Sequence, residues 1–437
     1  MLSNGHATCL RMPGRLAHQS LGTVPRAQLL PNNAALRSLS AVTCTSVSRR
    51  PAASTRASAS TFAPTLPPAP LRRTLTTSAP RSSQKPFSFL TAYAFQGKPR
   101  HSEDAMQEGD SSSSAAADEP EASASGAAED GAKRGQIGFP PDSEIGRWRD
   151  ELLRGGEAGE DSLMCTSMGS AGDVAIGVAD GVGGWTENGI DPSLFSQALM
   201  FYASKAAASA PAGSSSTNGN GAPKRILAEA FEHVLKEPLV VAGSATACIL
   251  TMDASNGTLH SANLGDSGFV ILRQGTGKHG VFHASPPQQL GFNTPLQLAK
   301  LPKEWIQEGS ISNTPKDAAA WECTLQHGDL IIVGTDGLFD NVDPKIEIPQ
   351  FAKFIKEKHH ASYAARHAGT DKPADSLQED REFVQVLATN LIEYAKICQN
   401  STTKQSPFER EAARYGIHFP GGKIDDVAIV CCLVIER

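Results

Sequence analysis

Short apolar runs that meet acidic residues recur along the second half of the chain. Residues 174–179 read Val-Ala-Ile-Gly-Val-Ala and lead into Asp180 and Gly181, and residues 328–335 lead in the same way into Asp336 and Gly337. A third run, residues 427–435, follows a pair of aspartates. Uninterrupted apolar runs of this length are typical of strands buried on both faces. The pattern therefore predicts a core of buried strands with carboxylates at the strand boundaries.

The remaining pattern predicts hairpins and helices around these strands. Alternating aromatic and small residues predict a first strand over residues 86–95. Strands over 244–252 and 258–264 are joined at Asn256-Gly257, a strong hairpin signal, and a tight turn at 265–268 leads into a strand over 269–273. Apolar positions at helical spacing predict five helices, over residues 143–153, 193–208, 224–236, 348–358 and 381–398. Hairpin-linked strands separated by helices, without regular βαβ alternation, predict an α+β fold with stacked sheets and outer helices.

Composition places the chain among soluble globular proteins. It has 437 residues, 40% of them hydrophobic and 20% charged. No stretch reaches the roughly 18 consecutive apolar residues of a membrane span. The eight cysteines form no CxxC pair, zinc spacing or disulfide framework.

The N-terminal segment has a charge pattern of its own. Residues 1–102 contain 13 Lys and Arg and no Asp or Glu, whereas the whole chain has a net charge of -6. A basic, Ser- and Ala-rich segment without a long apolar run is typical of an organelle transit peptide. We expect residues 1–82 to be a disordered mitochondrial transit peptide that leads to the matrix, with Arg73–Ser78 as its processing signal. The alternative is a basic tail that binds nucleic acid or acidic lipid.

Two low-complexity segments interrupt the part after the transit peptide. Residues 102–135 are rich in Ser, Ala and Glu, and residues 209–223 are rich in Ser, Gly and Asn. Such compositions bury too little apolar surface to fold. We therefore expect one catalytic domain over residues 83–437 that contains two disordered insertions.

Four acidic positions share the same context at strand boundaries. Glu160-Asp161 and Asp425-Asp426 precede strands, and Asp180 and Asp336 end them. Any one Asp-Gly is more often only a turn. As a set, these carboxylates suit Mg²⁺ or Mn²⁺, which take oxygen ligands, and no His- or Cys-rich group suggests zinc. Two such ions about 3.5–4 Å apart could activate a bridging water and hold a phosphoryl group.

The order of these motifs resembles a known family, the metal-dependent Ser/Thr phosphatases called protein phosphatase 2C, and above all its mitochondrial branch. The resemblance covers about residues 86–100 and 140–437. It rests on Glu160-Asp161, Val178-Ala-Asp-Gly-Val-Gly-Gly184 with Trp185, Ser244-Ala-Thr-Ala247, Asn263-Leu-Gly-Asp-Ser267, Gln288–Leu298, Thr335-Asp-Gly-Leu-Phe-Asp340 and Asp425-Asp-Val427.

The resemblance implies a four-layer αββα sandwich with two antiparallel sheets and a binuclear Mn²⁺ or Mg²⁺ site at one end. By position, Asp180 would bridge both ions, and Glu160 and the carbonyl of Gly181 would serve one of them. Asp336 and Asp425 would serve the other ion. Asp266 matches a position linked to a looser third ion, and Asp161 would orient a metal-bound water from outside the ligand set. Asp180, Asp336 and Asp425 are thus the expected catalytic residues.

Two positions depart from the family pattern. Val182 stands where many members have a His proposed as general acid, and Gly156 stands where many have an Arg that holds the substrate phosphate. Protonation of the leaving group would then fall to a metal-bound water. Phosphate capture is left open among the metals, the nearby Arg154 and a group that the sequence does not identify.

The functional hypothesis is a monomeric mitochondrial phosphatase that hydrolyses phosphoserine and phosphothreonine in mitochondrial proteins through a metal-bridging water. The resemblance links it to mitochondrial metabolism, including ubiquinone synthesis. A catalytically weak pseudophosphatase that acts as a metal-stabilised binding protein is the alternative, motivated by the missing His and Arg. A nucleotide-binding loop at Gly181–Gly184 is disfavoured because the required Gly-Lys-[Ser/Thr] is missing. A haloacid-dehalogenase-type phosphatase is excluded because Asp180 does not begin an Asp-x-Asp.

Overall fold

The computed structural model describes residues 42–44, 86–99, 137–169, 172–210, 221–276, 280–306, 311–367 and 375–437. Their strands form antiparallel sheets and their helices lie outside them, as the predicted α+β class requires. No helix in these ranges is both long and apolar enough to cross a membrane.

Two large antiparallel sheets form the centre of the molecule. In spatial order, the six-stranded sheet contains β1 (Val42–Cys44), β2 (Phe87–Gln96), β15 (Val427–Glu436), β14 (Leu330–Gly334), β8 (Gly268–Leu272) and β9 (Val281–Ala284). The five-stranded sheet contains β13 (Ala319–Thr324), β7 (Thr258–Leu264), β6 (Ala247–Met252), β4 (Asp173–Asp180) and β3 (Asp161–Met168). Two small sheets pair β10 (Gln289–Gly291) with β11 (Thr294–Pro295), and β12 (Leu298–Lys300) with β5 (Gly243–Ala245).

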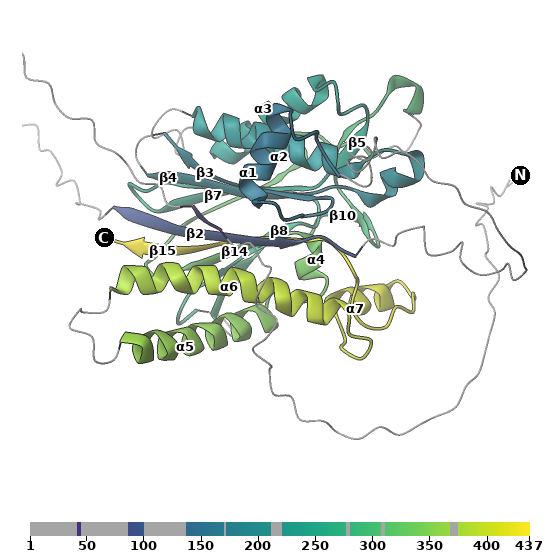
Figure 1. Ribbon diagram of the computed structural model, residues 1–437. Helices are drawn as coiled ribbons and strands as arrows, with labels where there is room; N and C mark the ends of the chain where they lie inside the picture. Colours follow the sequence, from purple (N-terminus) through teal and green to yellow (C-terminus); the bar gives the residue numbers. More distant parts are fainter. Residues whose placement is uncertain are drawn as a thin grey trace, which may run out of the picture. The chain divides into compact units, whose positions relative to one another are not determined.

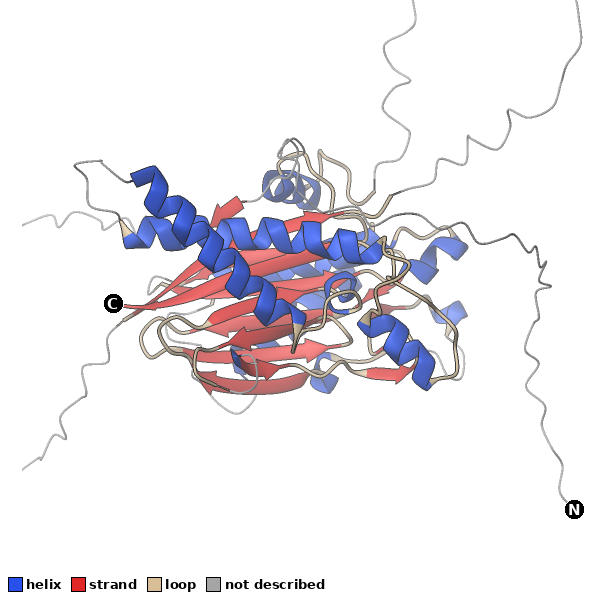
Figure 2. Cartoon of the chain, turned by 90° about the horizontal axis from the view of Figure 1, so that it is seen from below, coloured by secondary structure: helices blue, strands red, loops and turns tan. Residues whose placement is uncertain are grey.

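Helices cover the outer faces of both sheets (Figure 1). On the five-stranded sheet these are α1 (Glu144–Leu153), α2 (Pro192–Ala208) and α3 (Gly221–Lys236). On the six-stranded sheet they are α5 (Glu347–His367) and α6 (Ser376–Gln399), the two long helices seen lying over the strands in Figure 2. The shorter elements are α4 (Asp336–Phe339), α7 (Pro407–Arg414) and the 3₁₀ turns η2 (Gly183–Asn188), η5 (Lys303–Trp305) and η6 (Pro315–Asp317).

Local sequence explains where the first helices begin. The Ser143 hydroxyl accepts a hydrogen bond from the amide of Gly146, and the Asp191 carboxylate accepts one from the amide of Ser193. Both are side-chain caps that satisfy amides left free at a helix start. The predicted boundaries of α1 and α2 are confirmed to within one residue.

The apolar core has a layer on each face of each sheet, which accounts for the uninterrupted apolar runs in the sequence. Ile176 of β4 and Val430 of β15 belong to the cluster between the sheets. Their neighbours point the other way: Ala175 packs under α2 and α3, and Ile429 packs against α6. Because successive side chains of a strand alternate in direction, a strand buried on both faces carries no polar alternation.

Two boundaries differ from the sequence-based predictions. The predicted strand 244–252 is split at Thr246, where β5 leaves the five-stranded sheet to pair with β12. The tight turn predicted at residues 265–268 does lead into the next strand, and there the chain crosses from β7 in one sheet to β8 in the other. Helix α3 begins at Gly221, so the predicted insertion 209–223 is too long at its C-terminal end. Ala222 and Pro223 are buried, and this burial draws them into the helix.

The other predicted disordered segments lie almost wholly outside the described residues. This holds for residues 102–135 and for residues 1–82, apart from Val42–Cys44. That short segment pairs with β2 as β1, in contrast to the expectation of a presequence without structure. The outer edge of β2 offers backbone groups that such a segment can pair with.

Candidate metal centre and active site

Strand ends from both large sheets meet at one edge and bring acidic residues together. In the five-stranded sheet, Asp161 begins β3 directly opposite Asp180, which ends β4. In the six-stranded sheet, Asp336 follows β14, and Asp425 precedes the antiparallel neighbour β15. Antiparallel neighbours place the end of one strand beside the start of the next. Each sheet therefore contributes carboxylates to the same edge.

All six residues predicted to contact metal line one cavity of about 380 Å³. They are Glu160, Asp180, Gly181, Asp266, Asp336 and Asp425. Asp161 does not line this cavity. It accepts a hydrogen bond of 2.8 Å from the Thr335 hydroxyl.

Asp180 is held at the point where β5 and β6 separate. Its amide donates to the Thr246 hydroxyl (3.2 Å), and its carbonyl accepts from the Thr246 amide (2.9 Å). The next residue, Gly181, donates its amide to the Glu160 carbonyl (3.1 Å) and packs too closely against Pro192 and Glu160 for a side chain. The Asp-Gly pair therefore fixes Glu160 and Asp180 next to each other.

Asp426 fastens the backbone around the site. Its carboxylate accepts from the amide of Lys98 (2.6 Å) and from the amide of Glu160 (2.9 Å). Gly159 passes so close to it that a Cβ would collide with the carboxylate, and its φ of 66° is left-handed. One buried carboxylate thus joins the ends of β2 and β15 to the start of β3.

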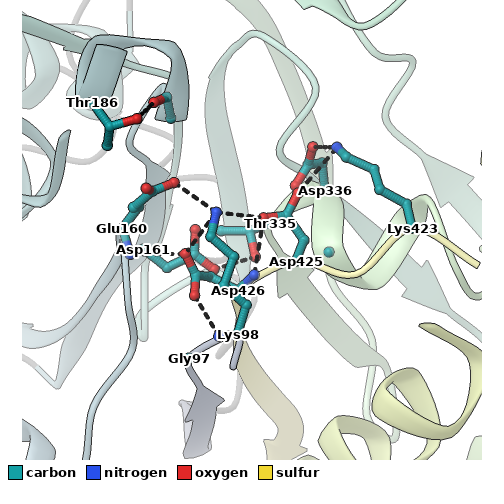
Figure 3. A network of polar contacts seen from close by, with 12 residues as sticks. Gly97, Lys98, Glu160, Asp161, Thr186, Thr335, Asp336, Lys423, Asp425 and Asp426 are labelled. Atoms are coloured by element: carbon teal, nitrogen blue, oxygen red, sulfur yellow. Dashed lines mark hydrogen bonds and ion pairs between the residues drawn. The ribbon is translucent and has the colours of Figure 1, made fainter. Parts of the chain in front are cut away.

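Two lysines that the sequence analysis did not single out lie among the carboxylates (Figure 3). The ammonium of Lys98 lies 2.8 Å from Glu160 and 3.4 Å from Asp425. The ammonium of Lys423 contacts Asp336, Asp340 at 2.9 Å and Asp425 at 3.1 Å. A Lys two residues before the Asp425-Asp426 pair was visible in the sequence, but its side-chain direction was not.

Burial and mutual repulsion dominate the electrostatics of the cavity. Burial, and then the charge of Asp336, raise the pKa of Asp180 above its ordinary range. Burial is also the main cause that raises the pKa of Asp266 to about 6 and that of Asp340 to about 8. Burial is the largest influence on Asp336 too and opposes its ionisation, but Lys423, a hydrogen bond with Asp180 and the charge of Lys98 together outweigh it and lower the pKa of this carboxyl. Charged carboxylates in this number and depth call for further positive charge.

The donor chemistry fits hard divalent cations. The predicted ligands offer only oxygen, and Asp336 Oδ1 is buried without a hydrogen-bond partner. As they stand, no three Asp, Glu, His or Cys side chains in the described ranges are grouped tightly enough to hold an ion. The ammonium groups of Lys98 and Lys423 lie between them instead.

The structure also describes Val182 and Gly156, the two positions that depart from the family pattern. Val182 lines the cavity and offers no proton to a leaving group. Gly156 and Arg154 do not line it, and Arg154 is an exposed residue that ends α1 with a φ of 48°. Arg154, one of the three options left open for phosphate capture, therefore has no support in the arrangement of the cavity.

Comparisons with known proteins agree with these features. The family model described as Stage II sporulation protein E (SpoIIE) matches residues 170–382. The chain is 35% identical over 283 residues to the 5-azacytidine resistance protein azr1 of Schizosaccharomyces pombe, covering 64% of this chain and 83% of that protein. Among solved structures, the photosystem II phosphatase PBCP matches with 25% identity and a TM-score of 0.47, covering 66% of this chain and 95% of that one.

A human relative, Protein phosphatase PTC7 homolog, is 33% identical over 322 residues, which cover 73% of this chain and 92% of that protein. The PTC7 homologue of Xenopus laevis is likewise 33% identical, with 88% of its length covered. In this chain the acidic motifs occur in order and line one cavity. The sequence is also similar to these two relatives over nearly their full length. The chain belongs to the PTC7 branch of the protein phosphatase 2C family and is a protein-serine/threonine phosphatase.

Proposed function

We propose that this phosphatase depends on two Mn²⁺ or Mg²⁺ ions and acts on phosphorylated mitochondrial proteins in the matrix. The cavity that collects all six predicted ligands is the observation that carries the metal assignment. Its framework is a four-layer αββα sandwich, a proposal supported by helices packed outside two antiparallel sheets.

The residues of the cavity have distinct roles in this proposal. Asp180 would bridge both ions, with Glu160 and the Gly181 carbonyl on one side and Asp336 and Asp425 on the other. Asp266, held by a hydrogen bond of 3.0 Å from Gln289, would serve a looser third ion. Divalent ions in such a site lower the pKa of water and neutralise charge on a phosphoryl group.

The side chains that line the cavity determine which groups of the protein can protonate the leaving group. Val182 cannot protonate the leaving alkoxide, and no histidine lines the cavity among the described residues. Carboxyl and ammonium groups are the protein's remaining proton donors there.

Substitution of the central carboxylate tests the metal assignment. Asp180→Asn should lower kcat on a phosphoserine peptide by 100-fold or more at saturating Mn²⁺, because an amide is a poor bridging ligand. Calorimetric titration of Mn²⁺ should show weaker binding. Asp142→Asn, an exposed carboxylate before α1, is the matched control and should leave both unchanged. Full activity of Asp180→Asn would contradict the proposal.

The mitochondrial location rests on the basic, acid-free residues 1–102. Fusion of residues 1–82 to a fluorescent protein should direct it to mitochondria. Replacement of the arginines in that segment by glutamine should leave it in the cytosol. The specific substrates, including enzymes of ubiquinone synthesis, would be sought by comparing mitochondrial phosphopeptides from cells that contain the wild-type protein or Asp180→Asn.

A binding protein with little catalytic activity is the second candidate, favoured by Val182 and by the missing Arg at Gly156. It predicts metal binding without turnover. Hydrolysis of a simple aryl phosphate by the Mn²⁺-loaded wild-type protein would exclude it.

A further inference from the structure

A phosphate group that enters the cavity needs positive charge, from the proposed divalent ions and from side chains of the protein. A phosphomonoester is a dianion near neutral pH, and here it has to approach a cavity lined by five carboxylates. Neither Gly156 nor Arg154 reaches this cavity. Among the described residues, the positively charged side chains that line it are Lys98 and Lys423.

Lys423 is fully engaged with the protein. Its ammonium contacts Asp336, Asp340 and Asp425, the last two at 2.9 and 3.1 Å, and its side chain is 16% exposed. An ammonium has three donors, and three carboxylates account for them. Lys423 is therefore the internal counter-charge of this side of the cavity.

Lys98 is held differently. Its ammonium has one close partner, Glu160 at 2.8 Å, whereas Asp425 and Asp426 lie at 3.4 and 3.5 Å. Its side chain is 34% exposed, about twice as much as that of Lys423. Donors and solvent access thus remain for a ligand.

The backbone of Lys98 is anchored independently of its side chain. Its amide donates to the buried carboxylate of Asp426 (2.6 Å), which fixes the residue at the rim of the cavity beyond the end of β2. Figure 3 shows the side chain extending from this anchor toward Glu160 and Asp425. A change of side chain would leave the anchor in place.

We propose that Lys98 binds the phosphate group of the substrate, in the role that Gly156 cannot fill. The proposal rests on the proposed function, because it takes Glu160 and Asp425 to be engaged by divalent ions. Engagement of those two carboxylates by the ions would leave the Lys98 ammonium with only Asp426, at 3.5 Å, and with donors available to a phosphoryl oxygen. Lys98 is then a binding residue contributed by the end of β2, far in sequence from the other site residues.

Binding of inorganic phosphate to the Mn²⁺-loaded full-length protein tests this directly. Loss of a charge-assisted hydrogen bond should weaken phosphate binding by about tenfold or more in Lys98→Met, as measured by calorimetry. The KM for a phosphoserine peptide should rise by a similar factor. Mn²⁺ affinity should stay equal or increase, because the metal no longer competes with an ammonium for Glu160.

The Mn²⁺ titration separates phosphate binding from a purely structural role. If Lys98 only positioned Glu160, its removal would weaken Mn²⁺ binding and leave phosphate binding per loaded protein unchanged, which would overturn the proposal. Lys98→Arg should restore phosphate binding. Lys205→Met is the matched control, since Lys205 forms an ion pair of 2.7 Å with Glu144 outside the cavity.

Two further outcomes distinguish this proposal from the proposed function. If wild type binds Mn²⁺ and phosphate and Lys98→Met does so equally well, Lys98 is not the phosphate-binding residue. Weaker phosphate binding by Arg154→Met in the same experiment would then identify Arg154 as the phosphate-binding residue. If wild type binds neither Mn²⁺ nor phosphate, the metal-dependent function itself fails.

Discussion

Lys423 shows how a single residue determines the charge balance of the site. It lies two residues before Asp425 and joins that carboxylate to Asp336 and Asp340. The pKa of Lys423 is raised well above its ordinary value because these carboxylates outweigh the effect of burial. The ammonium therefore stays charged at neutral pH.

Removal of this charge should be costly in the metal-free protein. Lys423→Met leaves three partly buried carboxylates without their partner, and breaking a buried ion pair from one side costs about 3–5 kcal/mol. Urea denaturation in EDTA should show this loss. Lys353→Met is the control, because Lys353 and Glu357 form an exposed pair at 3.9 Å and should contribute less than about 0.5 kcal/mol. A loss no larger than that of the control would contradict the role given to Lys423.

At the scale of elements, Thr335 connects the two large sheets at the site. It follows β14 and is fully buried. Its hydroxyl donates to Asp161 at the start of β3 (2.8 Å) and accepts from the amide of Ala428 in β15 (3.0 Å). The same side chain thus orients an acidic residue of one sheet from a strand of the other.

Replacement of Thr335 by valine tests this connection. The side chains have nearly the same shape, but valine leaves the Asp161 carboxylate and the Ala428 amide without that partner. An unsatisfied buried polar group costs about 1–3 kcal/mol, so we expect a loss of that order in the free energy of unfolding. Mn²⁺ affinity should fall as well, because Asp161 is no longer oriented. Thr335→Ser keeps the hydroxyl and should therefore retain most of the stability and most of the Mn²⁺ affinity. Equal losses in Thr335→Val and Thr335→Ser would instead indicate that the methyl group matters through packing.

The sequence allowed the acidic set to be predicted because each carboxylate sits at the boundary of a local pattern. Asp180, Asp336 and Asp425 all lie where an apolar run begins or ends, and strands of one antiparallel sheet bring such boundaries together. The split at Thr246 was not predictable from residues 244–252, because both halves are equally apolar. It depends on β12, which lies about fifty residues later in the chain.

The two lysines escaped prediction for a related reason. Lys98 follows a predicted strand, and Lys423 lies in a polar stretch, where a lysine is most often solvated. Their inward direction follows from tertiary contacts: the amide of Lys98 binds Asp426, and the amide of Lys423 binds Asn341 at 2.9 Å. Contacts between residues 328 and 82 positions apart leave no periodic signal in a sequence.

At the scale of the whole molecule, the two sheets are joined at an edge where like charges gather. Carboxylates from both sheets line one cavity, and two ammonium groups offset only part of their charge. Bound divalent ions would supply the rest. Ligands that bind only the folded state stabilise it by about 2.7 kcal/mol at a free concentration of 100 Kd. Metal should therefore act as a structural link between the sheets as well as a cofactor.

The metal-free protein should accordingly become less stable as pH rises. Burial raises the pKa of Asp266 to about 6 and of Asp340 to about 8, so the folded state holds protons that the unfolded chain releases near pH 4. Each group's stabilising contribution is complete below its unfolded pKa and is lost as pH rises through its folded pKa. In EDTA, the free energy of unfolding should fall between pH 5 and pH 8. Saturating Mn²⁺ should reverse the slope, because protons then compete with the metal for the same oxygens.

The variant Asp340→Asn tests how much of this fall in unfolding free energy with pH comes from Asp340. An amide cannot ionise, so the variant should lose the part of the slope that lies near pH 8 while keeping the part that comes from Asp266 and Asp180. Lys98 and Lys423 stay charged throughout this range and add no slope of their own. Urea midpoints measured at half-unit steps of pH, with and without Mn²⁺, provide the comparison. A wild-type protein that becomes more stable in EDTA from pH 5 to pH 8, in parallel with Asp340→Asn, would show that the carboxylates are paired well enough without metal.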